Sequence, residues 1–163
     1  MVERLVFPEA LRQDLIAHAH EGGANEVCGI LAGKANVVER IFPIRNIADE
    51  IHASEGVFRD RDTNLPADGQ LDKDYYMDPR DYLRASLEMD ELGLERVGYY
   101  HSHVNAEARP SPRDVRLATD LEAVYVLVGP MIGDGDGPQV RAWHIVKSSH
   151  ESEGGHVVEI PLA

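Results

Sequence analysis

The chain has 163 residues and a formal net charge of −13, from 16 lysines and arginines against 29 aspartates and glutamates. This balance excludes nucleic acid as a partner, because nucleic-acid binding needs a basic patch that neutralises phosphates. It argues against attachment to an anionic membrane surface for the same reason. About 43% of the residues are apolar. The chain can therefore bury a core, and its length suits one domain over residues 1–163.

Cysteine use and the distribution of apolar residues indicate a cytoplasmic protein. Cys28 is the only cysteine, so no internal disulfide can form, which is typical of a reducing compartment. Cys28 itself is expected to be a small buried hydrophobe. The N-terminal residues lack the basic start and apolar core of a signal peptide. The longest apolar stretch, residues 123–132, is shorter than the roughly 20 residues that span a membrane.

The first part of the chain predicts a short strand, a helix and a hairpin. Pro8 suits the first turn of the helix, apolar residues then recur at helical spacing, and Gly22 and Gly23 end it. The two hairpin strands are continuous apolar runs joined by a tight turn. These elements are expected at residues 5–7, 8–22, 27–33 and 37–44.

The middle of the chain predicts an insertion and then a second helix. Residues 45–73 are acidic and show little apolar periodicity, so a long, mobile insertion is expected there. Asp78 caps the helix ahead of Pro79, and Gly93 ends it. The apolar side of this helix is expected to carry Leu83, Leu87 and Met89.

The last part of the chain predicts strands around a third helix, which begins at Ser111 and Pro112 and runs to about Asp120. Strands are expected at residues 75–77, 97–100, 124–129, 140–146 and 156–160, with a turn at 133–137. Because strands and helices interleave, we predict an α/β domain with a mixed β-sheet flanked by about three helices.

The segment with most chemical information is HSHVNAEARPSPRD, residues 101–114. His101 and His103 end an apolar strand, and strand alternation points both imidazoles to one face, as bidentate metal ligation requires. Taken alone, this pair is about as consistent with two unrelated histidines at a strand end as with a metal site. Ser111 and Asp114 form a helix cap when taken alone. A helix that starts beside the histidines would place Asp114 on the metal and Ser111 next to it.

The combined pattern, His-x-His, seven residues, then Ser-x-x-Asp, resembles the signature of the JAMM (MPN+) metallopeptidases. Glu26 in NEVCGILAGK matches the glutamate that this family carries on an early strand. The resemblance extends over most of the chain. It is greatest to small stand-alone prokaryotic members, including those that remove cysteine from the C-terminus of a sulfur-carrier protein. It implies the JAMM/MPN fold, with its cytidine-deaminase-like architecture.

The resemblance also implies the roles of the residues. His101, His103 and Asp114 would hold one Zn²⁺ and leave the fourth position to water. Glu26 would act as general base and Ser111 would donate a hydrogen bond to the oxyanion. The expected reaction is hydrolysis of a peptide or isopeptide bond after the C-terminal Gly-Gly of a ubiquitin-like or sulfur-carrier protein, by a monomer or a homodimer.

Two other interpretations remain open at this point. A cupin-type enzyme would use His101, His103, Glu107 and a later His144, but cupins are all-β and this chain predicts helices. A non-enzymatic MPN-type scaffold would lack the metal ligands that are present here. The charge adds a further hypothesis, because residues 45–81 hold ten of the 29 acids. If these acids rim the cleft, they attract a basic carrier tail and cleavage slows as salt rises.

Overall fold

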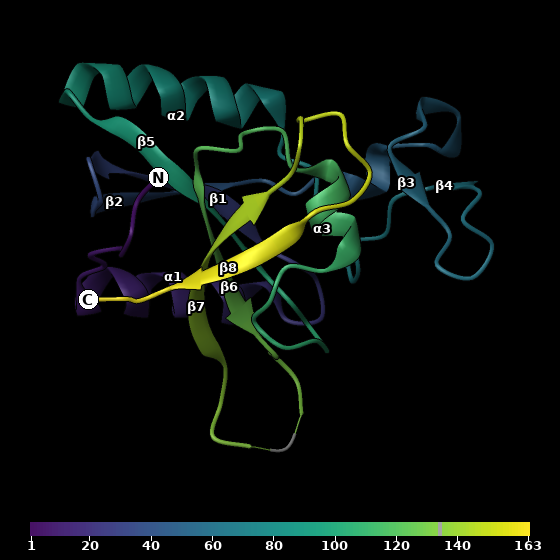
Figure 1. The fold of residues 1–163 in the computed structure, drawn as a ribbon. Coiled ribbons are helices and arrows are strands. Elements are labelled where there is room, and N and C mark those ends of the chain that lie inside the picture. Colours follow the sequence, from purple (N-terminus) through teal and green to yellow (C-terminus); the bar gives the residue numbers. More distant parts are fainter. Residues whose placement is uncertain (134) are drawn as a thin grey trace.

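A six-stranded mixed β-sheet organises the fold in the computed structural model, which describes residues 1–133 and 135–163 (Figure 1). The strand order is β2-β1-β5-β6-β7-β8, and only the central β5/β6 pair is parallel. The strands are β1 (Cys28–Lys34), β2 (Val37–Ile44), β5 (Glu95–Ser102), β6 (Val124–Gly129), β7 (Gln139–Val146) and β8 (His156–Ile160). The predicted α/β class, the hairpin at the start and the edge strand at the end are confirmed.

Three α-helices flank the sheet: α1 (Glu9–Gly22), α2 (Pro79–Leu92) and α3 (Pro112–Leu117). Asp78 caps α2 by accepting a hydrogen bond from the Arg80 N–H at 2.9 Å, and Gly93 ends it in the left-handed region. The helix α3 is shorter than expected, because Ala118 already has extended backbone angles. Among the described residues, no helix has the length and apolar character needed to cross a bilayer.

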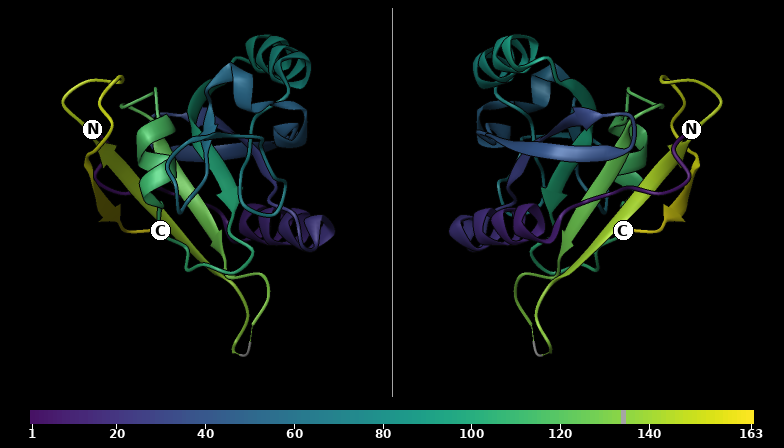
Figure 2. Two further views of the ribbon diagram at one scale, coloured as in Figure 1. Left: turned by 90° about the vertical axis from the view of Figure 1, so that its right-hand side faces the viewer. Right: turned by 90° about the vertical axis from the view of Figure 1, so that its left-hand side faces the viewer.

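The helices cover the two faces of the sheet unequally (Figure 2). α1 packs on one face through Leu15 and Ala19, against alternate residues of the central strands. α2 and α3 cover the other face, each over its own apolar cluster. Tyr99 of β5 contacts both of these clusters. Because side chains alternate along a strand, His101 lies on the same face as Tyr99, between α2 and α3.

The predicted apolar side of α2 is wrong. Ala85 and Met89 are the residues of α2 that pack on the sheet, whereas Leu83 and Leu87 are 60% and 56% exposed. A separation of six residues places Met89 on a different side of the helix from Leu83. Ala85 and Met89 are four residues apart, so they share one side of α2, and they join the apolar cluster formed with residues of β1 and β2.

The insertion at residues 45–73 contains elements of its own, which differs from the expected mobile loop. Two short 3₁₀ helices and a two-stranded hairpin cover a small core of Ala48, Ile51 and Phe58. Leu117 of α3 packs against this core. These elements are η1 (Ala48–Glu50), η2 (Ala53–Glu55), β3 (Phe58–Arg59) and β4 (Pro66–Ala67). The apolar residues are too widely spaced for sequence periodicity, but they meet in space.

The shorter predicted elements are reduced to single bridges. The strand expected at residues 5–7 contributes one bridge to Leu162 and one to Val37. The strand expected at residues 75–77 contributes only the bridge between Asn46 and Met77. The turn expected at 133–137 includes Asp134, which lies outside the described residues.

Candidate metal centre and active site

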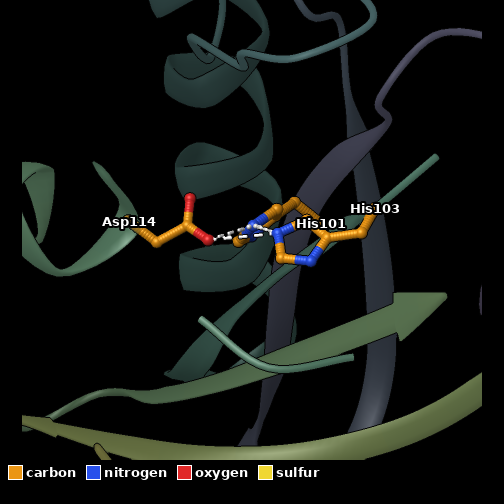
Figure 3. A group of neighbouring side chains, drawn as sticks. All are labelled: His101, His103 and Asp114. Carbon is orange, nitrogen blue, oxygen red and sulfur yellow. Dashed lines mark hydrogen bonds and ion pairs between the residues drawn. The ribbon is translucent and has the colours of Figure 1, made fainter. Parts of the chain in front are cut away.

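His101, His103 and Asp114 converge where β5 ends and α3 begins (Figure 3). The Nε2 atoms of the two imidazoles are 3.3 Å apart. Asp114 Oδ2 lies 3.2 Å from Nε2 of His101 and 3.1 Å from Nε2 of His103. The expected placement of both imidazoles on one face is therefore confirmed, and the carboxylate arrives from the other side of the cleft.

The three atoms fit a tetrahedral metal. Zn²⁺ binds nitrogen and oxygen at about 2.0–2.1 Å, and tetrahedral ligands at that radius are about 3.3 Å from one another. The observed separations of 3.1–3.3 Å match this value. Two imidazoles and one carboxylate are also the donor set of catalytic zinc sites that keep one position open.

Asp114 has a structural role as well as its place in this triangle. Ser111 caps α3, with its Oγ accepting a hydrogen bond from the Asp114 N–H at 3.1 Å. Asp114 Oδ2 accepts one from the Ser111 N–H at 2.8 Å. The capping box predicted from the Ser-x-x-Asp spacing is confirmed. The same Oδ2 atom faces both imidazoles, so that capping and metal ligation use one oxygen.

Neighbouring groups fix the orientation of both histidine rings. Tyr75 stacks on His101 with ring centroids 4.3 Å apart. The Nδ1–H of His103 donates to the Glu107 carbonyl at 2.8 Å, which leaves Nε2 directed at the triangle. Gly129 lies against His103, and a Cβ there would come within 2.6 Å of the His103 carbonyl oxygen. The Tyr75 contact could not be predicted from the sequence, since stacking between residues far apart in the chain leaves no local pattern.

The charges within the triangle favour a cation. Burial opposes ionisation of Asp114, but the two imidazoles hold its pKa well below the usual range. Burial lowers the pKa of His101 and keeps that ring neutral. Burial also acts on His103, but its hydrogen bond and charge interaction with Asp114 raise its pKa. Metal ligation needs neutral imidazoles and an ionised carboxylate, so affinity for a metal falls as the solution becomes more acidic.

Glu26 lies beside the triangle and is only 7% exposed. Burial, and next the negative charge of Asp114, raises its pKa from 4.5 to about 8. The charge of His103 acts in the opposite direction. A carboxyl group that holds a proton near neutral pH suits a residue that accepts and returns protons. The family resemblance implied that Glu26 lies near the site; the structure places it where its charge interacts with those of Asp114 and His103, and its catalytic role stays a prediction.

The backbone around Glu26 is held on both sides. Its N–H donates to the Leu71 carbonyl at 2.7 Å, and its carbonyl accepts from Asn46 Nδ2 at 2.9 Å. Ser102, whose side chain alternates with those of His101 and His103, accepts from the Val27 N–H at 2.9 Å. Residues of the insertion at 45–73 therefore hold the backbone of Glu26 in place, a role that the composition of the insertion did not indicate.

Asn46 satisfies its whole side-chain amide in this support. Its Nδ2 donates to the carbonyls of Glu26 and Asp74 at 2.9 and 3.0 Å. Its Oδ1 accepts from the N–H groups of Ala48 and Tyr76, both at 3.0 Å. Asn46 thus joins the Glu26 segment to the start of the insertion and to the segment that follows the insertion.

Replacing Asn46 by alanine should therefore destabilise the protein by about 1–3 kcal/mol, because the four groups it pairs lose their partner. It should also lower kcat while zinc content stays the same, since Glu26 is displaced and the metal ligands are not. Denaturant unfolding and steady-state kinetics measure the two effects. Asn36→Ala is the matched control, because Asn36 is half-buried like Asn46 but its side chain donates a single hydrogen bond, to the Arg4 carbonyl. Equal losses in both variants would contradict the role of Asn46.

The raised pKa of Glu26 predicts how metal-free protein responds to pH. Between about pH 4.5 and pH 8 the folded state keeps a proton that the unfolded chain releases. The unfolded state then binds fewer protons, and stability falls as pH rises. The loss should be a few kcal/mol, on the order of 1.4 kcal/mol for each pKa unit. In chelator-treated Glu26→Gln most of this loss should be absent. Denaturant unfolding near pH 5 and pH 9 tests this, and parallel pH profiles of the two proteins would contradict it.

Three other residues considered from the sequence lie outside the site. The Glu107 side chain is exposed, and only its backbone carbonyl contacts a ligand. His144 is buried on β7, where its Nε2 bonds the Val2 carbonyl, so the cupin-type set of ligands does not assemble. Cys28 is fully buried, and burial raises its pKa to about 12, as expected of a hydrophobic cysteine.

A pocket of about 580 Å³ borders Ser111, and its charged lining is mainly basic. The charged side chains are four arginines and two acids: Arg59, Arg61, Arg113, Arg116, Asp60 and Glu153. The acids of residues 45–81 do not form an acidic rim here. Asp74 pairs with Arg113, and Asp60 accepts hydrogen bonds from its own turn. The lining of this pocket gives no support to an acidic rim, and the expected attraction of a basic tail stays a prediction.

Comparison with known proteins agrees with the site. The family described as prokaryotic homologs of the JAB domain matches residues 8–146. The chain is 31% identical over 157 residues to the CysO-cysteine peptidase of Mycobacterium tuberculosis, covering 95% of this chain and 92% of that protein. It is 29% identical over 133 residues to the desampylase of Haloferax volcanii, covering 78% and 81%.

Structural comparison gives the same result. A solution structure of a protein from Desulfitobacterium hafniense superimposes with a TM-score of 0.70 and 26% identity, covering 98% of this chain and 91% of that one. The resemblance inferred from the His-x-His and Ser-x-x-Asp spacing is confirmed. The chain belongs to the prokaryotic JAB-domain family, the JAMM metallopeptidases.

Proposed function

We propose that the protein is a zinc-dependent hydrolase that cleaves the amide bond after the C-terminal Gly-Gly of a ubiquitin-like or sulfur-carrier protein. The observation that carries this proposal is the triangle of His101, His103 and Asp114, with Glu26 buried beside it. The two relatives, a CysO-cysteine peptidase and a desampylase, suggest the substrate class.

Each residue would have a distinct role. His101, His103 and Asp114 would hold Zn²⁺, which when bound activates water and polarises the scissile carbonyl. Glu26 would take a proton from the attacking water and return it to the leaving amine. The glycine carbonyl gains a hydroxyl group and the nitrogen gains a hydrogen, so water is divided between the two products. Ser111, at the start of α3, would donate a hydrogen bond to the oxyanion.

A Gly-Gly tail suits a site at the end of a strand between two helices. Glycine has no side chain, so the tail can lie extended in a narrow space and bring its carbonyl to buried groups. The ligands support this requirement, since His101 and His103 are only 2% and 5% exposed. A bulky residue before the scissile bond would have to displace Tyr75 or the start of α3.

The test uses zinc-loaded protein and two substrates, a sulfur-carrier protein with a C-terminal cysteine after Gly-Gly and a ubiquitin-like protein in isopeptide linkage. Cleavage of at least one substrate, abolished by a chelator and restored by Zn²⁺, is expected. Metal content by elemental analysis should approach one zinc per chain. Absence of chelator-sensitive cleavage of either substrate across pH and salt would overturn the proposal.

A further inference from the structure

Lys147 follows the last residue of β7, and its ammonium group lies at the C-terminal end of α3. Its Nζ donates to the backbone carbonyls of Val115, Arg116 and Ala118 at 2.9, 3.1 and 3.0 Å, and to the His150 carbonyl at 3.3 Å. Three of these carbonyls belong to the end of α3 and its C-cap residue. Because the last carbonyls of a helix have no partner within the helix, Lys147 supplies the partner that they lack.

The end of α3 differs from the ends of the two longer helices. Gly23 and Gly93 occupy the C-cap positions of α1 and α2, whereas Ala118 occupies that of α3 with extended backbone angles. A cation at this end interacts favourably with the helix dipole. An ammonium group has three hydrogens that point in different directions, which suits converging carbonyls better than a planar guanidinium group does. The use of lysine here fits that geometry, in a chain with only three lysines against 13 arginines.

The neighbouring backbone leaves room for the Lys147 side chain. A Cβ at Gly155, just before β8, would lie 2.7 Å from Lys147 Cγ and 3.3 Å from Val115 Cγ1. A side chain at Gly155 would therefore displace the lysine, the helix or both. The contact between Lys147 and α3 thus depends on close packing of three segments: the end of β7, the start of β8 and α3.

Lys147 connects α3 to the sheet that carries the two histidines. His101 lies on β5, which pairs with β6, and β6 pairs with β7, the strand that Lys147 follows. Asp114 lies on α3, and its backbone carbonyl accepts from the Ala118 N–H at 3.0 Å. Ser111 caps the first turn of this helix, and Lys147 holds the last. One sheet therefore sets the position of the imidazoles and, through Lys147, the position of the helix that carries the carboxylate.

We propose that Lys147 is a positioning residue of the metal centre, which holds α3 where Asp114 meets His101 and His103. The inference rests on the proposed function, in which Asp114 is a metal ligand. The position matters because ligating groups have to be held within about 0.5 Å of the productive geometry. Asp114 Oδ2 has that geometry at 3.1 and 3.2 Å from the two Nε2 atoms.

The apolar packing of α3 does not perform this task alone. Val115 and Ala118 pack in the cluster between α3 and the sheet, which keeps the helix on the sheet. Apolar contacts are not directional, so they leave the helix free to slide or tilt. A helix of six residues is also too short to fix itself. The directional hydrogen bonds of Lys147 therefore determine where the end of the helix lies.

Lys147→Met tests this role, because methionine keeps an unbranched side chain and lacks the charge and the donors. Zinc affinity, measured by competition with a chelator, should fall by about tenfold or more. The visible absorption of the Co²⁺-loaded variant should differ from that of the unmodified protein, since this absorption depends on ligand geometry. At saturating zinc, kcat should fall and KM should not change, because the lysine is directed at α3. Lys147→Arg should retain part of the affinity.

The control and the second variant separate the outcomes. Lys34→Met is the matched control, because Lys34 is the exposed last residue of β1. If Lys147→Met loses stability but keeps the zinc affinity and Co²⁺ absorption of the control, Lys147 only caps the helix and the inference is overturned. If Lys147→Met does not fold, Lys147→Arg is decisive. Its planar group serves fewer of the carbonyls, so unchanged affinity and absorption in that variant would overturn the inference.

The proposed function and this inference fail in different ways. Chelator-sensitive cleavage by the unmodified protein, together with unchanged zinc binding in the Lys147 variants, would remove only the positioning role. Absence of zinc binding by the unmodified protein would overturn both.

Discussion

Glu26→Gln should lower kcat by about 10²–10⁴-fold while the protein keeps its zinc. Glu26 is not part of the triangle of His101, His103 and Asp114, so the amide should leave metal affinity nearly unchanged. Glutamine has a similar shape but cannot accept a proton from water, and the proton-transfer step is lost. Elemental analysis and steady-state kinetics on the same preparation measure both properties.

The control for this variant is Glu107→Gln. Glu107 is exposed in the loop between the ligands, and its contact with His103 uses only the backbone carbonyl. Its turnover should therefore stay within about twofold of that of the unmodified protein. Normal turnover in Glu26→Gln would remove Glu26 from the mechanism, whatever its burial.

Asp114→Ala should abolish stoichiometric zinc binding and with it the chelator-sensitive cleavage. The substitution removes one of three protein ligands and leaves two imidazoles, which is one ligand fewer than catalytic zinc sites use. It also removes the acceptor of the Ser111 N–H, so the start of α3 should loosen. Added Zn²⁺ should then no longer raise the melting temperature, whereas in the unmodified protein it should.

Glu107→Ala gives the opposite expectation and separates the JAMM site from a cupin-type set. In a cupin-type site Glu107 would be a ligand and Asp114 would not. If Glu107→Ala lost zinc and Asp114→Ala kept it, the assignment of the metal site would be wrong. Isothermal titration of both variants with Zn²⁺ decides between the two.

The parts of the fold and site that could be predicted from the sequence are those with a local physical cause. Alternation along a strand placed His101 and His103 on one face, and the spacing of Ser111 and Asp114 produced the capping box. In each case the residues that determine the feature are a few positions apart. Glu26 could be added only through the family resemblance, since a single acid at the start of a strand has no pattern of its own.

The parts that could not be predicted depend on contacts between distant segments. Tyr75 stacks on His101, and Asn46 bonds the Glu26 carbonyl, across separations that leave no periodic signal. The prediction of the buried side of α2 was wrong for Leu83 and Leu87, because Ala85 and Met89 pack against the sheet in their place. The sequence predicts a mobile insertion because the core of that insertion is assembled from single apolar residues without periodicity.

The oxygen shared by the cap and the metal triangle, Asp114 Oδ2, couples binding of the ion to the stability of α3. The helix α3 has six residues, too few to be stable without its cap and its packing. Asp114 Oδ2 accepts the Ser111 N–H in the first turn of α3 and also faces both imidazoles. Gain or loss of the ion therefore changes the strength of this capping hydrogen bond. Chelation should therefore loosen α3 as well as stop the reaction, and amide hydrogen exchange in α3 should quicken when the ion leaves.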